Sequence, residues 1–266
     1  MYRKSTNLAP VWGPYVVDGE IVRHDVREGS EGVDLYLDIG VIDTETCEPL
    51  PNAYLTIWHC NATGTYSGFT GIDPDTASVY DGTTTRADGT TDDETFLRGV
   101  MNTNEEGVAE FLTIFPGYYI TRSTHIHLTV QTNVTGNETS DYSYSKASVQ
   151  HIGQLFFNES MINSVYELDA YSAHLATLNR TLNADDGIYV SSNEGGYSSV
   201  ISVQLLGETI ADGLVGYISV GVNSSAEAAT TTGGSVNVLG VIPTLSVADA
   251  ARQTAIDIDI GEGYAY

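Results

Sequence analysis

Positively charged residues are scarce in this chain. Its 266 residues include 10 Lys and Arg against 35 Asp and Glu, which gives a formal net charge of −25. A surface this acidic repels polyanions, which argues against nucleic acid and membranes as partners. The same negative charge disfavours the binding of substrates that carry a carboxylate, unless a nearby Arg offsets the repulsion.

Long apolar runs and cysteines are also few. No apolar run approaches the roughly 20 residues that a bilayer-spanning helix needs. The first six residues, Met-Tyr-Arg-Lys-Ser-Thr, lack the apolar segment of a signal peptide, so any such signal would already have been removed. The only cysteines are Cys47 and Cys60. We expect them to form one disulfide, the alternative being two buried free thiols.

Asn-x-Ser/Thr sequons are more frequent than chance suggests, since random placement would give about three. Together with the expected disulfide, they predict a secreted glycoprotein. The sequons begin at Asn61, Asn133, Asn137, Asn158, Asn179 and Asn223.

Apolar residues recur in short or alternating segments that are typical of strands. The segment from 68 to 93 is rich in Gly, Asp and Thr and predicts a long surface loop. One or two short helices are expected, the best candidate being Asn158 to Leu168 with its single apolar face. The fold class is therefore all-β, as one antiparallel β-sandwich with long loops. The predicted strands are 33–42, 53–59, 108–114, 125–132, 200–206 and 216–222.

The composition changes after residue 222, where a linker-like run of Asn, Ser, Ala, Thr and Gly begins. We predict one domain over residues 1–222, followed by a linker and C-terminal tail over 223–266. The alternating residues 255–260 are compatible with an edge strand or with a mobile tail.

His125 and His127 carry the strongest chemical signal. Alternate residues of a strand face the same side, so both imidazoles can reach one metal ion. A His-x-His pair by itself is more often structural than metal-binding. A phenol lies nearby, because the Pro116–Gly117 turn folds the chain back toward the same end of the sheet. Tyr118 and Tyr119 follow that turn, and one of these adjacent rings should be ordinary packing.

Several motifs, in order and spacing, resemble the intradiol ring-cleavage dioxygenases, and in particular their secreted, fungal-type extracellular members. The resemblance runs from the first turn to about Val222. Its main motifs are Trp-His-Cys-Asn-Ala-Thr-Gly-Thr-Tyr-Ser at 58–67, Phe-Leu-Arg-Gly at 96–99, Gly-Val-Ala-Glu-Phe-Leu-Thr-Ile-Phe-Pro-Gly at 107–117 and Arg-Ser-Thr-His-Ile-His at 122–127. It is extended by Gly-Pro-Tyr at 13–15 and His-Ile-Gly-Gln-Leu-Phe-Phe at 151–157.

The resemblance implies a transthyretin-like (prealbumin-like) sandwich that holds Fe(III) at one end. It makes Tyr119 and His127 axial ligands, Tyr66 and His125 equatorial ligands, and a solvent hydroxide the fifth. Tyr119 would be the ligand that leaves when substrate binds, and Tyr118 the packing aromatic. The other implied site residues are Arg122 facing the bound ring, Gln154 as a partner of that Arg, and Gly13, Pro14 and Tyr15 along the pocket.

The implied reaction is the cleavage of a catechol-type diol by O2 between its two hydroxylated carbons, giving a muconate-type diacid. Two tyrosinates offset much of the charge of Fe(III) and keep it ferric, so the substrate rather than O2 is activated. Arg122 would stabilise negative charge on the attacked carbon.

Two rival functions are a non-catalytic secreted protein that binds metal or phenols, and a zinc hydrolase, although zinc seldom uses paired phenolates. The sequence leaves open whether the substrate is catechol, hydroxyquinol, protocatechuate or a larger lignin-derived phenol. It also leaves open whether the protein is a monomer or a homodimer.

Overall fold

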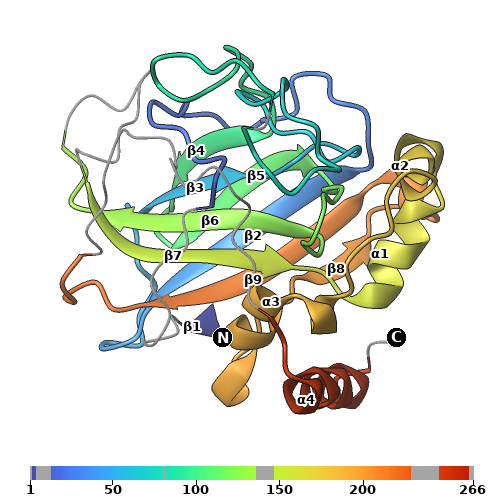
Figure 1. The fold of residues 1–266 in the computed structure, drawn as a ribbon. Coiled ribbons are helices and arrows are strands. Elements are labelled where there is room, and N and C mark those ends of the chain that lie inside the picture. The colour runs from blue at the N-terminus through green and yellow to red at the C-terminus, as the bar shows by residue number, and fades with distance from the viewer. Residues whose placement is uncertain (1, 4–12, 81, 136–146, 229–245, 264–266) are drawn as a thin grey trace.

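The computed structural model describes residues 2–3, 13–80, 82–135, 147–228 and 246–263. Two β-sheets make up most of the regular structure, and the helices gather late in the chain (Figure 1). All the strands that the sequence predicts are present. The structure adds β1 (Tyr2–Arg3), β4 (Arg98–Asn102) and β7 (Ser148–Phe156), which were not predicted.

The first sheet has the order β1-β9-β2-β5, with β8 also paired to β9. Its further strands are β2 (Asp34–Asp43), β5 (Val108–Ile114), β8 (Ser202–Leu205) and β9 (Leu214–Val222). The prediction of a purely antiparallel fold is wrong here, because β9 runs parallel to β2. Parallel neighbours need a long connection, and most of the chain separates these two strands.

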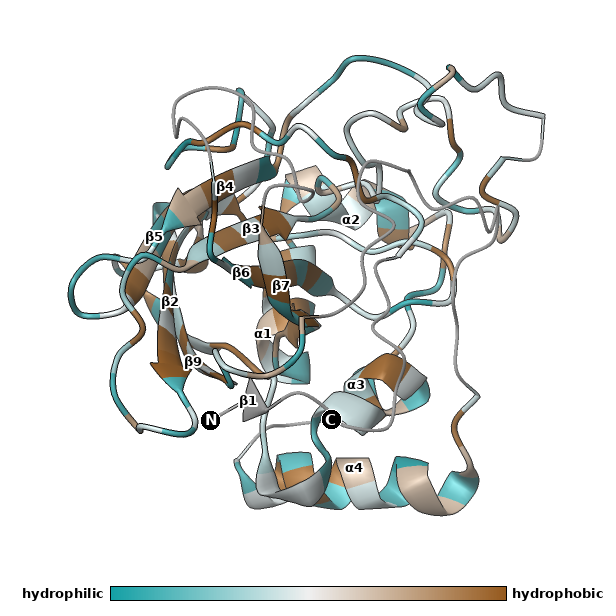
Figure 2. Ribbon diagram, turned by 90° about the vertical axis from the view of Figure 1, so that its left-hand side faces the viewer, coloured by the Kyte–Doolittle hydropathy of each residue, from teal (hydrophilic) through white to brown (hydrophobic). Residues whose placement is uncertain are grey.

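The second sheet is antiparallel throughout, in the order β4-β3-β6-β7. Its remaining strands are β3 (Tyr54–Trp58) and β6 (His125–Thr132). Alternate residues of β2, such as Leu35 and Leu37, share one hydrophobic core with Leu55 of β3 and Leu128 of β6. Figure 2 shows the two sheets as separate layers. The two sheets therefore bury one face each against the other.

Both faces of the second sheet are covered in its middle. Every residue of β3 is buried, and so is β6 up to its last residue. A second apolar cluster, which includes Tyr15, Val16, Trp58 and Ile152, covers the face turned away from the first sheet. Polar side chains on that face, such as those of His125 and His127, are therefore shielded from water.

The helices are α1 (Glu159–Tyr166), α2 (Asp169–Leu175), α3 (Gly187–Ser192) and α4 (Asp249–Gly261). The helix predicted at Asn158 to Leu168 is confirmed as α1, and the side chain of Asn158 caps it by accepting from the Met161 N–H. The expectation of one or two helices is wrong, because α2 and α3 are too short to show a helical period in the sequence. No helix in the described ranges is both long and apolar enough to cross a membrane.

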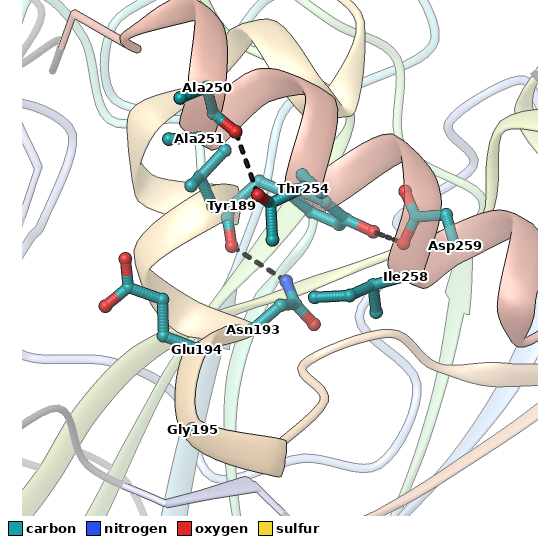
Figure 3. A pocket seen from close by; sticks show the side chains of 11 residues that line it. Tyr189, Asn193, Glu194, Gly195, Ala250, Ala251, Thr254, Ile258 and Asp259 are labelled. Carbon is teal, nitrogen blue, oxygen red and sulfur yellow. Dashed lines mark hydrogen bonds between the residues drawn. The ribbon is translucent and has the colours of Figure 1, made fainter.

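Residues 255–260 belong to α4 rather than to an edge strand or a mobile tail. On the helix Ala255 and Asp259 are four residues apart, and both are buried. The hydroxyl of Tyr189 on α3 donates a hydrogen bond of 2.5 Å to the Asp259 carboxylate. A groove of about 390 Å³ lies between the two helices (Figure 3).

The expected disulfide is not formed, because Cys47 and Cys60 are both free thiols. Cys47 is exposed in the turn after β2, whereas Cys60 is buried just after β3. The two thiols belong to different loops, one that follows β2 and one that follows β3.

Thiol titration tests this correction. We expect the native, unreduced protein to react rapidly at the exposed Cys47 alone, and the denatured protein to react at both cysteines. Cys60 should resist, since burial raises the pKa of its thiol to about 12. Cys47→Ala should change the free energy of unfolding by less than about 0.5 kcal/mol. Denatured protein without free thiols would show that the bridge forms after all.

Candidate metal centre

His125 and His127 stand at the beginning of β6, between β3 and β7. Their Nε2 atoms are 3.1 Å apart, and both rings are buried. The Nδ1 atom of His125 lies 2.6 Å from the Ser123 carbonyl oxygen, which can only accept. The proton therefore sits on Nδ1 and leaves the Nε2 lone pair of His125 free to bind a metal.

Two tyrosines complete this group. The Tyr119 hydroxyl is 3.3 Å from His125 Nε2. The ring of Tyr66 meets those of Tyr119 and His127 edge-on, with centroids 5.6 and 6.2 Å away, and its buried hydroxyl has no hydrogen-bond partner. Tyr118 instead donates to the Leu178 carbonyl and belongs to the main core. Only the second of the adjacent tyrosines faces the histidines.

The segment 13–15 covers this group from one side. Gly13 has a φ of +76°, and a Cβ built on it would lie 2.8 Å from His127 Cε1. Tyr15 stacks on Tyr66 with ring centroids 4.3 Å apart, and Pro14 is buried between Gly13 and Tyr15. On another side Trp58 stacks on His127 at 4.7 Å. These contacts leave little freedom to the rings.

Arg122 is buried beside the four side chains. Its Nε donates to Asp186 Oδ2 at 2.9 Å, its Nη2 donates to Gln154 Oε1 at 2.5 Å, and its Nη1 lies 3.5 Å from the Tyr119 hydroxyl. The sequence motifs do not point to Asp186. The one available signal was an Asp directly before a helix, which marks a possible N-cap but no particular partner.

The chain is similar in sequence and fold to known proteins. A dioxygenase family model matches residues 12–142. An intradiol ring-cleavage dioxygenase from Tetranychus urticae is 30% identical, with a TM-score of 0.64 over 83% of this chain and 97% of the other. The chain belongs to the intradiol ring-cleavage dioxygenase family. A second solved dioxygenase is 29% identical, with a TM-score of 0.63 over 83% and 96% of the two chains. No curated protein matches the chain.

This intradiol dioxygenase is thus an aromatic ring-cleaving oxidoreductase of a family that uses non-haem iron. Among the residues that the structure describes, no cluster of three or more His, Cys, Asp or Glu could hold a metal. The side chains beside His125 and His127 that could add ligands are the phenols of Tyr66 and Tyr119. Phenols in these places argue against a zinc hydrolase, whose ligands are His, Cys and carboxylates.

Burial keeps all four side chains of the dioxygenase neutral unless a cation is present. It lowers the pKa of His125 to about 3, with Arg122 adding to the effect, and holds the pKa of His127 well below its ordinary value. It also raises the pKa of Tyr119 to about 12 and that of Tyr66 well above its ordinary value. A bound cation would lower the pKa of both phenols again, because it stabilises their phenolate forms.

The arrangement fits a metal ion better than it fits the side chains alone. Two facing imidazole Nε2 atoms can share at most one proton, and the Tyr66 hydroxyl is buried without a partner. A buried polar group left unsatisfied costs about 1–3 kcal/mol. One ion among the four donor atoms would satisfy all of them.

Arg98 fastens the loops around the dioxygenase site. Its guanidinium donates to the backbone carbonyls of Tyr15 and Ser67 and lies 5.8 Å from the centre of the Tyr66 ring. The buried Glu20 carboxyl lies 3.6 Å from Arg98, and burial raises its pKa to about 7 although Arg98 and Arg23 oppose this shift. Arg98 thus ties the segment before β2 to the loop that carries Tyr66.

The sequons are spread over the molecule. Asn133 and Asn179 are exposed, and Asn137 lies outside the described residues. The partly buried Asn61 accepts from the N–H groups of Thr63 and Thr65 through its side-chain oxygen. The remaining two are Asn158, which caps α1, and Asn223, which donates to Glu45.

Alanine at Gly13 tests the close approach to His127. Gly13→Ala should lower the affinity of the protein for iron by at least about 10-fold, because the new Cβ displaces the His127 ring. Gly19→Ala is the matched control, since Gly19 has a φ of +87° but open space around it. Both variants should lose about 1 kcal/mol of stability to backbone strain. Equal iron affinity in the two variants, measured by titration, would contradict the contact.

Proposed function

We propose that this dioxygenase binds Fe(III) through Tyr66, Tyr119, His125 and His127 and uses O2 to cleave catechol-type diols between their two hydroxylated carbons. The products would be muconate-type diacids. The convergence of two buried phenols and two neutral imidazoles on one point is the observation that carries the proposal. Bound Fe(III) would supply the positive charge that favours the diol in its ionised form.

The choice of the ferric ion follows from the donor set. Two phenolates carry two negative charges, which a trivalent cation balances better than a divalent one. Fe(II) oxygenases typically use two His and one carboxylate instead. The carboxylate of Asp186, which contacts Arg122, is already used by that guanidinium and by Ser123.

Tyr119 and Arg122 have distinct proposed roles. The oxygen of Tyr119, as a phenolate, would accept a proton when the diol binds, and burial in this site favours the resulting neutral phenol. Arg122 Nη1, 3.5 Å from that oxygen, would stabilise negative charge on the ring carbon that O2 attacks. Gln154 and Asp186 hold the guanidinium while segment 13–15 keeps water out.

Absorbance and oxygen uptake test the iron site. We expect the iron-loaded protein to be reddish from tyrosinate-to-iron charge transfer and to take up O2 with catechol. Tyr119→Phe should lose part of the absorbance and lower kcat by about 100-fold or more. Tyr118→Phe, changed at the neighbouring ring that faces the core, should retain both properties. A folded wild-type protein that stays colourless and inactive after iron loading would refute the proposal.

The negative charge of the protein should influence which diols the enzyme accepts as substrates. Arg122 is neutralised by Asp186 at 2.9 Å, and every arginine from Arg23 to Arg252 is ion-paired with an acidic side chain. The surrounding protein carries a net charge of −25. We therefore propose that neutral catechols are the preferred class of substrate.

Protocatechuate and its methyl ester separate charge from size. At pH 7 and low salt, kcat/KM for the acid should be at least about 10-fold lower than for the ester, since a desolvated carboxylate without a partner is costly. Added salt should narrow the difference only in part, because salt screens the surface charges but not the buried site. Equal kcat/KM values for the acid and the ester would rule out this preference.

We also propose that the enzyme is a secreted glycoprotein. The six sequons support this, and two of them, Asn133 and Asn179, are exposed and accessible to a glycosyltransferase.

A further inference from the structure

We propose that Asp186 is a positioning residue of this dioxygenase, whose one carboxylate orients both the Arg122 guanidinium and the His125 imidazole. The roles of Arg122 and His125 rest on the proposed function. The contacts that join them to Asp186 stand independently of it. Asp186 belongs to the turn before α3, more than 60 residues beyond both partners in the sequence.

One oxygen of the carboxylate faces the site. Asp186 Oδ2 accepts from Arg122 Nε at 2.9 Å, from the Ser123 backbone N–H at 2.9 Å and from the Ser123 hydroxyl at 3.2 Å. These three donors come from two consecutive residues that lie immediately before β6. The oxygen therefore fixes the backbone of this turn together with the guanidinium that extends from it.

Ser123 links the Asp186 carboxylate to the His125 ring. The N–H of Ser123 is held by Asp186, and the carbonyl of the same residue accepts from His125 Nδ1 at 2.6 Å. This bond keeps the proton on Nδ1 and sets the rotation of the ring. Such outer contacts determine which nitrogen of a histidine is available to a metal. A shift of the Ser123 peptide would release the His125 ring.

The contact to Arg122 fixes a buried charge. Asp186 takes the Nε–H and Gln154 takes one Nη2–H, so the remaining Nη1 is directed toward Tyr119. Removal of the carboxylate leaves the guanidinium buried without its countercharge, which favours reorientation or entry of water.

The other oxygen holds Asp186 itself in place. Asp186 Oδ1 accepts from the backbone N–H groups of Ile188 and Tyr189 and so caps α3. Tyr189 also donates to Asp259 of α4, as Figure 3 shows, so α3 is held by both Asp186 and α4. A purely structural helix cap would explain these two bonds. It would not explain the three bonds that the second oxygen accepts.

Asp186→Asn separates the two roles. The amide oxygen can still cap α3, but the NH2 group would face the donors of Arg122 and Ser123. The matched control is Asp185→Asn. Asp185 is the neighbouring residue, and its carboxylate pairs with Arg252 rather than with Arg122. We expect Asp186→Asn to lower kcat by roughly 10–100-fold with KM within about 3-fold, and Asp185→Asn to leave both unchanged.

A double-mutant cycle shows whether the effect runs through Arg122. In an Arg122→Gln background, Asp186→Asn should lower kcat by a smaller factor than it does in the wild type, because the guanidinium that it positions is gone and only the route through His125 remains. Full additivity of the two losses would overturn the Arg122 part of the proposal. An unchanged kcat in the single variant with lower thermal stability would leave Asp186 as a helix cap.

The His125 tautomer gives a readout without iron or turnover. In metal-free protein, ¹H–¹⁵N spectra should show His125 protonated at Nδ1, and Asp186→Asn should give a mixture of tautomers. If that variant does not fold, Asp186→Ser retains a hydroxyl to cap α3 and should show the same change. An unchanged tautomer in a folded variant would overturn the His125 part. Loss of the proposed iron chemistry would leave this measurement unaffected.

Discussion

The alternation of side chains along β6 is the constraint on which this protein depends. Ile126 and Leu128 point into the core between the sheets, and His125 and His127 therefore point to the opposite face. Because β6 is an inner strand, its neighbours β3 and β7 supply Trp58 and Gln154 directly beside His127. One strand thus contributes to the core on one side and to the candidate metal centre on the other.

Burial of this second face determines its electrostatics. The imidazoles and phenols are all held neutral without a cation, and the buried guanidinium that lies beside Tyr119, that of Arg122, is balanced by Asp186. In such a poorly polarisable setting a metal ion gains strongly from phenolate ligands. In the proposed function, the same balance would let Arg122 stabilise charge that develops during the reaction, without an excess charge that attracts an anionic substrate.

Local patterns in the sequence predicted much of the fold and part of the site. Strands with apolar alternation were found, and the helix capped by Asn158 was found from its polar start. The strand β7 was missed because polar residues such as Gln150 and Gln154 interrupt its apolar pattern. The prediction of a disulfide was wrong because an even number of cysteines says nothing about the distance between them. Residues 255–260 were misassigned because their alternation also suits a helix with small buried positions such as Ala255.

By itself the sequence determined that His125 and His127 lie on the same face of a strand, since the period of a strand is a local property of the backbone. Its motifs also determined the family and the neighbourhood of Tyr66 and Tyr119. The resemblance also implied that Tyr119 rather than Tyr118 lies at the site, which strand geometry alone left open. Only the tertiary structure decided that Gly13 closes over His127 and that Asp186 holds Arg122. These are contacts between distant segments, and burial and packing of the whole chain select them.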